Sequence, residues 1–236
     1  MRTLLDRSTQ KAALAELIGT CLLTLTALLS SSPYAVALAL AALVYAIGNT
    51  SGCHVNPAIT LGLVSARRLP LATGLCYLVA QIGGAGLARG LAPRVGELAS
   101  GTQAARPFAE LIGAGFLMLV VAAVSDQHVP RAGSGIAIGA ALAAGLVTTK
   151  GILNPAIGIA MGQTLSGATW ATIAGGLLFT ALFTMVAQPK APTEEPAPGE
   201  ESAASPAAPP EADAEAAAAP AQPRRRRGWF GRQQIA

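Results

Sequence analysis

Asn56-Pro57-Ala58-Ile59 occurs a second time in this chain, as Asn154-Pro155-Ala156-Ile157. Both copies lie within long apolar stretches, where an Asn side chain is costly unless its amide has hydrogen-bond partners. Asn is a preferred N-cap and Pro is tolerated at the first helical position, so each copy predicts the start of a helix. The first helix can continue to about residue 66. About ten residues cover half of a hydrocarbon core that is roughly 30 Å thick, so we expect a half-helix that begins at mid-membrane.

The composition indicates an integral membrane protein with a solvated tail. Of the 236 residues, 52% are hydrophobic and only 12% are charged. In a typical soluble domain, about a quarter of the residues are charged. Residues 1–187 hold ten Lys or Arg and five Asp or Glu, and residues 188–236 hold six and seven. Because the basic residues flank apolar spans or lie at the C-terminus, the net charge of +4 does not indicate a nucleic-acid partner. The spacing of Cys and His predicts no metal site, no cofactor and no catalytic set.

The chain has six apolar spans, at about 12–30, 33–50, 70–88, 107–125, 132–149 and 167–187. The two half-helices follow the second and the fifth span. Residues 188–223 are rich in Pro, Ala and Glu and predict a disordered tail. The tail ends in four arginines, 224–227, followed by Trp229 and Phe230, a pattern that suits either an anionic membrane surface or a solvated terminus. We therefore expect one membrane domain over 1–187 and a cytoplasmic tail over 188–236.

An internal repeat divides the membrane domain in two. The sequence Ala-Glu-Leu-Ile-Gly occurs at 15–19 and again at 109–113, and Glu16 precedes Asn56 by 40 residues while Glu110 precedes Asn154 by 44. Each half, about 10–92 and 105–187, thus contains two spans, a half-helix and a third span. Because three full spans is an odd number, the halves must enter the membrane from opposite sides. The predicted fold class is all-α, with six transmembrane helices and two re-entrant half-helices in an inverted repeat.

The distribution of Lys and Arg predicts that both termini are cytoplasmic. In this orientation, six of the basic residues outside the tail lie on the cytoplasmic side and four on the outer side, as the positive-inside rule requires. The four outer residues are Arg89, Arg94, Arg106 and Lys150. The expected location is the plasma or inner membrane of the cell, where lipid surrounds the protein.

These motifs resemble those of the aquaporin, or major intrinsic protein, family. The first signature loop of that family is similar to residues 51–58, Ser-Gly-Cys-His-Val-Asn-Pro-Ala, and the second motif to residues 154–156. The resemblance spans about 10–187 and also covers Glu16, Tyr77, Gln81, Glu110 and the Ala-Ile-Gly at 137–139. It implies a passive channel for water or small uncharged solutes that assembles as a homotetramer and is not an enzyme.

The two repeated Asn residues fit a narrow pore on physical grounds. The carboxamides of Asn56 and Asn154 can donate N–H to a passing oxygen, and backbone carbonyls near 52–55 and 151–153 can accept hydrogen bonds. The positive ends of the two half-helices would repel cations. The simpler alternative is that both residues only cap their helices.

The intramembrane carboxylates are either braces or proton relays. The resemblance implies that Glu16 and Glu110 hydrogen-bond to the backbone of the signature loops and that Gln81 helps, and their place in the repeat favours bracing. His54 lies two residues before Asn56 and is expected to border the cytoplasmic vestibule. It serves there as a packing residue or as a pH gate.

The chain departs from the family pattern at the outer constriction. This constriction usually combines an aromatic residue, a His or small apolar residue, a small residue and an Arg directly after the second motif. Spacing maps these positions onto Val36, Leu146, Gly151 and Ile157. Without the Arg and the aromatic ring, we expect a wider and more apolar constriction. Lys150 either supplies a positive charge there or extends to the outer surface.

Four functions remain compatible with the sequence. A water channel is the default. A facilitator of glycerol or another small neutral solute is the close alternative, because the constriction lacks its Arg. A proton-coupled carrier would use Glu16 and Glu110 as relays, and a non-conducting structural membrane protein would explain the altered constriction.

Overall fold

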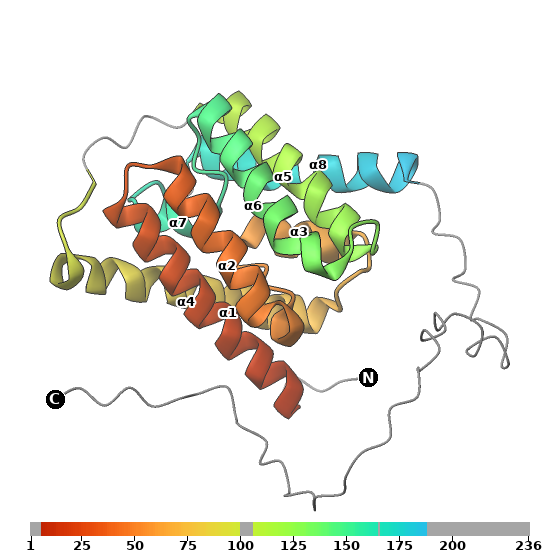
Figure 1. Ribbon diagram of the computed structural model, residues 1–236, viewed down its shortest axis with the longest axis horizontal. Coiled ribbons are helices and arrows are strands. Elements are labelled where there is room, and N and C mark those ends of the chain that lie inside the picture. The colour runs from red at the N-terminus through yellow and green to blue at the C-terminus, as the bar shows by residue number, and fades with distance from the viewer. Residues whose placement is uncertain (1–5, 100–105, 165, 188–236) are drawn as a thin grey trace, which may run out of the picture. The chain divides into compact units, whose positions relative to one another are not determined.

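The computed structural model describes residues 6–99, 106–164 and 166–187, which form helices and connecting loops without strands (Figure 1). The helices are α1 (Arg7–Leu29), α2 (Pro33–Ser51), α3 (Pro57–Ser65), α4 (Leu71–Val95), α5 (Pro107–Ser125), α6 (Arg131–Thr149), α7 (Pro155–Ala160) and α8 (Gly167–Val186). The six other than α3 and α7 are long and apolar enough to span a membrane. The predicted tail, 188–236 with its basic and aromatic end, lies outside the described residues, so its disorder and the domain boundary stay predictions.

The six predicted spans correspond to the six long helices, and capping side chains mark the start of α1, α2 and α8. Helix α1 begins at Arg7 rather than near residue 12, because the Asp6 side chain accepts a hydrogen bond from the Ser8 N–H. Helix α2 begins at Pro33, where the Ser32 hydroxyl accepts from the Ala35 N–H. Helix α4 continues to Val95 rather than ending near residue 88.

Two half-helices begin at the repeated tetrapeptides, as the sequence predicts. Asn56 and Asn154 are the N-caps, and their side-chain oxygens accept from the N–H groups of Ala58 and Ala156, each at 3.0 Å. Helix α3 has nine residues and ends at Ser65, close to the expected residue 66, whereas α7 has only six. Neither is long enough to cross a hydrocarbon core.

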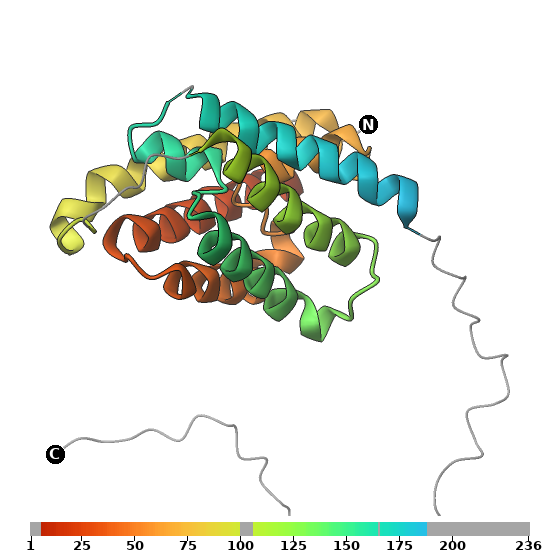
Figure 2. The ribbon, with the colours of Figure 1, turned by 90° about the horizontal axis from the view of Figure 1, so that it is seen from above.

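The packing of the helices has the symmetry of an inverted repeat, with α1–α4 matching α5–α8. Helix α1 packs against α2 and α4, and α5 packs against α6 and α8 in the same way. Each half-helix also packs against the other half of the chain, α3 on α8 and α7 on α4. The pairs α2–α6 and α3–α7 also join the two halves, and Figure 2 shows α2 and α6 side by side.

Glycines allow the closest helix contacts, at equivalent positions of the two halves. A Cβ atom at Gly84 of α4 would collide with the carbonyl oxygen of Leu17 in α1, and one at Gly175 of α8 with that of Leu111 in α5. Leu17 and Leu111 are the third residues of the repeated Ala-Glu-Leu-Ile-Gly sequence. The helices that follow the half-helices are therefore held directly against the helices that carry Glu16 and Glu110.

Candidate functional site

The site is built on the two residues that precede the repeated Asn. Val55 and Leu153 are fully buried and have positive φ angles of 42° and 58°. A positive φ is uncommon for any residue with a side chain and an outlier for a β-branched one, so both loops hold a strained backbone. Each of these residues has its N–H bonded to a glutamate of its own half and its carbonyl bonded to the Asn of the other half.

Asn56 and Asn154 each reach across to the opposite loop. The amide nitrogen of Asn56 donates to the Leu153 carbonyl, and that of Asn154 donates to the Val55 carbonyl, both at 2.9 Å. These two carbonyls were expected to face a permeant, but they also accept from the opposite Asn, because the loops meet directly. A primary amide has two N–H groups. One is used in this bond, which leaves the other for a molecule beside the two Asn.

Glu16 accepts four hydrogen bonds from the first loop and its neighbours, and it is fully buried. One carboxylate oxygen accepts from the Ser51 hydroxyl at 2.6 Å and the His54 N–H at 2.9 Å. The other accepts from the Val55 N–H at 2.7 Å and the Gln81 amide at 2.8 Å. A buried carboxylate is tolerated when hydrogen bonds satisfy it, and these bonds fix the loop backbone immediately before Asn56.

Glu110 has the same arrangement in the second loop, with one donor fewer. It accepts from the N–H groups of Ile152 and Leu153 and from the Thr172 hydroxyl. Thr172 matches Gln81, since each lies three residues before the glycine that contacts the glutamate-bearing helix. Sequence reasoning missed Thr172, although its spacing from Gly175 repeats the spacing of Gln81 from Gly84.

His54 belongs to a polar network that is found in the first half only. Its ring Nδ1 lies 3.2 Å from the Thr60 hydroxyl, which also accepts from the Gln81 amide at 2.9 Å. The ring meets Tyr77 edge-on, with 5.2 Å between centroids, and the Tyr77 hydroxyl donates to the Ser51 carbonyl. The positions that match His54 and Thr60 in the second half are Ile152 and Gly158. The network therefore has no counterpart there.

The two Asn line a small cavity at the centre of the helices, which we call the central cavity. Its volume is about 10 Å³, close to the least that one water molecule needs. Its wall is apolar except for the two Asn and His54. The lining residues are Leu23, Val36, Leu40, His54, Val55, Asn56, Ile59, Leu117, Leu142, Ile152, Asn154 and Ile157.

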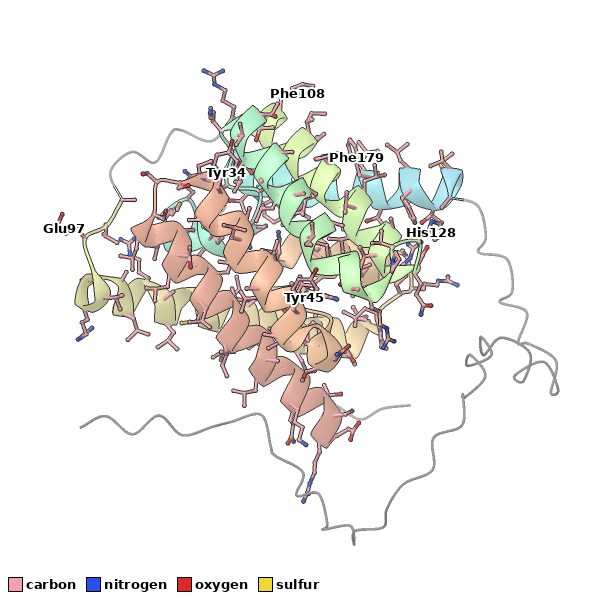
Figure 3. All side chains as sticks on the ribbon, in the orientation of Figure 1. Tyr34, Tyr45, Glu97, Phe108, His128 and Phe179 are labelled. Carbon is pink, nitrogen blue, oxygen red and sulfur yellow. The ribbon has the colours of Figure 1, made fainter. Side chains whose placement is uncertain are left out.

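A larger cavity of about 540 Å³, the mouth cavity, lies at the end where α1 and α6 finish. Its lining includes Ser30–Ser32, Arg89, Leu98, Leu146, Lys150, Gly151 and Met161. Val36, Ile152 and Ile157 line both cavities and so form the boundary between them. In Figure 3 this end is marked by Glu97 and the opposite end by His128.

The four residues assigned to the constriction all line the mouth cavity. Val36 and Ile157 lie at the boundary with the central cavity, while Leu146 and Gly151 lie on the mouth side only. The boundary consists of apolar side chains. The expected width is found in the mouth cavity alone, because the apolar side chains around the two Asn converge until room remains for about one water molecule. Ile152 completes this boundary and was missed from the sequence.

The opposite end carries the ion pair found among the described residues. The Arg68 guanidinium donates to both oxygens of Asp126, each at 2.6 Å, and to the Thr184 hydroxyl at 3.2 Å. This hydrogen bonding lowers the pKa of Asp126 below its ordinary value and raises that of Arg68, against the opposing effect of partial burial. Arg68 also lies over the Phe183 ring, 5.6 Å from its centroid.

Metal ligands do not gather in the part of the chain that the structure describes: no three His, Cys, Asp or Glu side chains come together there as a metal site would need.

The model of the family described as "Major intrinsic protein" matches residues 4–174 of the chain. The chain is 36% identical over 138 residues to aquaporin AqpM of Methanothermobacter thermautotrophicus, covering 50% of this chain and 56% of that protein. It is 35% identical over 214 residues to the lens fiber major intrinsic protein of Gallus gallus, covering 77% of this chain and 82% of that protein. The chain thus spans just over half the length of the archaeal relative and most of the avian one.

The fold is similar to that of a solved aquaglyceroporin from Plasmodium falciparum. The TM-score is 0.57 with 21% sequence identity, and the match covers 75% of this chain and 96% of that one. At this identity the likeness concerns the arrangement of the helices.

Proposed function

Because the chain belongs to the major intrinsic protein family, we propose that it is a passive channel for water and other uncharged molecules of similar size. The observation that carries this proposal is the pair of buried Asn amides beside the central cavity. Each uses one N–H to hold the opposite loop and keeps one N–H for a passing oxygen atom. The small volume of the cavity favours molecules that pass one at a time.

In this proposal Glu16, Glu110 and Gln81 brace the two loops. The support is that the two glutamates accept from the N–H groups of the strained Val55 and Leu153 and of the residue before each. Gln81 acts through Glu16, to which its amide donates. Neither glutamate lines the central cavity or the mouth cavity. A proton relay along the lumen through these carboxylates is therefore less well supported than bracing, and with it the carrier function.

We further propose a multi-pass protein of the cell membrane with both termini cytoplasmic, so that the mouth cavity faces outward and His54 borders the inner vestibule. Large apolar side chains cover the outside of the helices, with Leu38, Val79 and Phe108 at least 70% exposed. In a membrane such side chains face lipid or neighbouring subunits. Assembly as a homotetramer is proposed from family membership.

A facilitator of glycerol-sized neutral solutes is the second candidate. Two observations favour it: Ile157 stands where the family usually has an Arg, and the mouth cavity is large enough for such a solute. The central cavity argues for water, because a glycerol molecule would have to displace the surrounding leucines. We therefore place water first.

The test is osmotic flux across vesicles that contain the purified full-length chain, measured by stopped-flow light scattering with water, glycerol and urea. We expect Asn56→Leu and Asn154→Leu to lower water permeability about tenfold or more, because a lost hydrogen bond of about 1.4 kcal/mol corresponds to a factor of ten. The matched control is Asn49→Leu, which changes an exposed Asn of α2. The channel proposal fails if the wild type does not conduct, or if correctly inserted Asn56→Leu and Asn154→Leu proteins conduct normally.

A further inference from the structure

The arginine of the mouth cavity is held in place by a half-helix. Arg89 of α4 donates a hydrogen bond from Nη1 to the carbonyl oxygen of Ala160, the last residue of α7. Carbonyls at a helix C-terminus lack intrahelical donors and carry partial negative charge, so a guanidinium is well suited to this position. The bond fixes one edge of the Arg89 side chain and leaves its other N–H groups for a further partner.

This contact exists in one half of the molecule only. The position that matches Ala160 in the first half is Gly62, and a Cβ atom at Gly62 would lie 2.7 Å from the Thr180 hydroxyl of α8. Thr180 matches Arg89, as Thr172 matches Gln81. Equivalent positions of the inverted fold thus carry a small neutral side chain, Thr180, at one end of the pore and a cation, Arg89, at the other.

The positive charge of the mouth cavity is not balanced by carboxylates. Arg89 and Lys150 line it, and none of its described lining residues is Asp or Glu. Among the described residues, the one ion pair is Arg68–Asp126 at the opposite end. No described carboxylate therefore lies within 4.0 Å of the Arg89 guanidinium. Clefts lined by one sign of charge attract ions of the other sign.

Serine hydroxyls add hydrogen-bond donors to the same cavity. The Ser30 hydroxyl accepts from the Ser32 N–H, and the Ser32 hydroxyl accepts from the Ala35 N–H. In both bonds the hydroxyl oxygen is the acceptor, so its O–H group stays available to donate. Cations, spare donors and a volume of about 540 Å³ together match a site for a small anion with oxygen acceptors.

We propose that the mouth cavity binds a small oxyanion, a carboxylate or phosphate group, with Arg89 as the main ligand and Lys150 as the second charge. A planar guanidinium can bind such a group through two N–H groups at once. A bound oxyanion would lie over the boundary formed by Val36, Ile152 and Ile157, and so slow permeation. Binding stands apart from the proposed function, whereas the effect on flux rests on it.

Binding is tested by calorimetry on the full-length protein in detergent without added lipid, with sodium phosphate and sodium acetate as probes. We expect the wild type to bind at least one probe, Arg89→Met to weaken binding tenfold or more, and Arg89→Lys to weaken it less. Lys150→Met should have a smaller effect than Arg89→Met. The matched control is Arg94→Met, which changes a neighbouring arginine of α4 that bonds to Gly90 and does not line the mouth cavity.

The same oxyanion chemistry occurs in lipid headgroups, so a second arm measures retention of phosphatidylglycerol by each variant during delipidation. Retention that is lost in Arg89→Met and kept in Arg94→Met supports the site with lipid as its source. The proposal is overturned if neither probe nor the lipid binds the wild type, or if Arg94→Met loses as much binding as Arg89→Met.

A third arm measures the effect on flux. Phosphate added outside neutral-lipid vesicles should lower water permeability of the wild type and leave that of Arg89→Met unchanged. A wild type that binds the probe and conducts nothing would contradict the channel and leave the binding site standing.

Discussion

The two loops that carry the repeated Asn share one backbone design and differ in the side chains around it. In both, a residue with positive φ bonds to a glutamate of its own half and to the Asn of the other half. The first loop is surrounded by His54, Thr60 and Gln81, and the second by Ile152, Gly158 and Thr172. The backbone geometry is therefore what both halves need to present an Asn, while the side chains give the two ends of the pore different polarity.

The largest effect is expected where the two halves are most alike, at the glycines of the helix crossings. Gly84→Ala and Gly175→Ala each place a methyl group against the backbone of a neighbouring helix, at Leu17 and Leu111. Because backbone atoms cannot move aside as a side chain can, we expect both variants to lose most of the folded protein. The measurement is the yield of monodisperse protein by size-exclusion chromatography after extraction in mild detergent.

Gly86→Ala is the matched control. Gly86 lies on the same helix as Gly84, and a Cβ atom there would meet nothing within 4 Å. It should fold at least as well as the wild type, since Ala favours a helix over Gly by about 1 kcal/mol. If only one of Gly84→Ala and Gly175→Ala fails to fold, the packing of the two halves is less equivalent than their geometry indicates.

The next effect tests the difference between the glutamates. Glu16→Leu leaves four donors without their acceptor. Glu110→Leu leaves two, because the Thr172 hydroxyl can still donate to the Ala168 carbonyl, and each unsatisfied buried donor costs about 1–3 kcal/mol. We therefore expect Glu16→Leu to lower the melting temperature and the water permeability more than Glu110→Leu does. Gln at either position keeps one carbonyl oxygen as an acceptor and should lower stability and permeability less than Leu does. A well-folded Glu16→Gln protein with normal stability and no transport would indicate a proton relay instead of a brace.

The sequence predicts the framework of this site well, because the framework is repeated. Two identical tetrapeptides, two glutamates at similar separations and six apolar spans are enough for the inverted fold. The cross-bonding of Asn56 to Leu153 spans 97 residues, and no local pattern indicates it. The positive φ of Val55 is equally hidden, since Val is a residue that sequence reasoning assigns to extended backbone.

The site residues that the sequence does not indicate owe their roles to contacts with parts of the chain that are distant in sequence. The sequence places Arg89 among the basic residues that orient the helices, whereas in the structure its guanidinium bonds to the carbonyl oxygen of Ala160 in α7, 71 residues later. Ile152 completes the apolar boundary because it lines both cavities, and no local pattern around it in the sequence indicates this position.

The third effect concerns the apolar boundary, where the second half differs from the family pattern. Ile157→Arg adds N–H donors and bulk between the mouth cavity and the central cavity. We expect the ratio of glycerol to water permeability to fall several-fold, because a narrower and more polar boundary hinders glycerol more than water. The measurement is paired stopped-flow flux in wild-type and variant vesicles, and Ile157→Leu controls for a change of shape without charge. An unchanged or higher ratio in Ile157→Arg would show that residue 157 does not set selectivity.

The smallest effect separates the two ends of the pore by their charges. At one end Arg68 is paired with Asp126, and at the other Arg89 has no carboxylate partner among the described residues. The hydrogen bonds from Arg68 lower the pKa of Asp126, with His128 acting in the same direction. A carboxyl group whose pKa is lowered by folding stabilises the folded protein at pH values above its ordinary pKa of about 4. This stabilisation is lost as the pH falls through the pKa of the folded state.

Asp126→Asn removes that contribution, so its melting temperature should fall less than that of the wild type between about pH 5 and pH 3. The pair is partly exposed, with side-chain exposures of 16% and 29%, and such pairs contribute about 1 kcal/mol or less. The difference between variants should therefore amount to a few degrees at most. Glu97→Gln is the control, because Glu97 is an exposed carboxylate at the opposite end. Equal acid sensitivity of the wild type and Asp126→Asn would mean that the Arg68–Asp126 ion pair adds nothing to stability. The two ends would then differ only in their charge, and not in a stabilising ion pair at one of them.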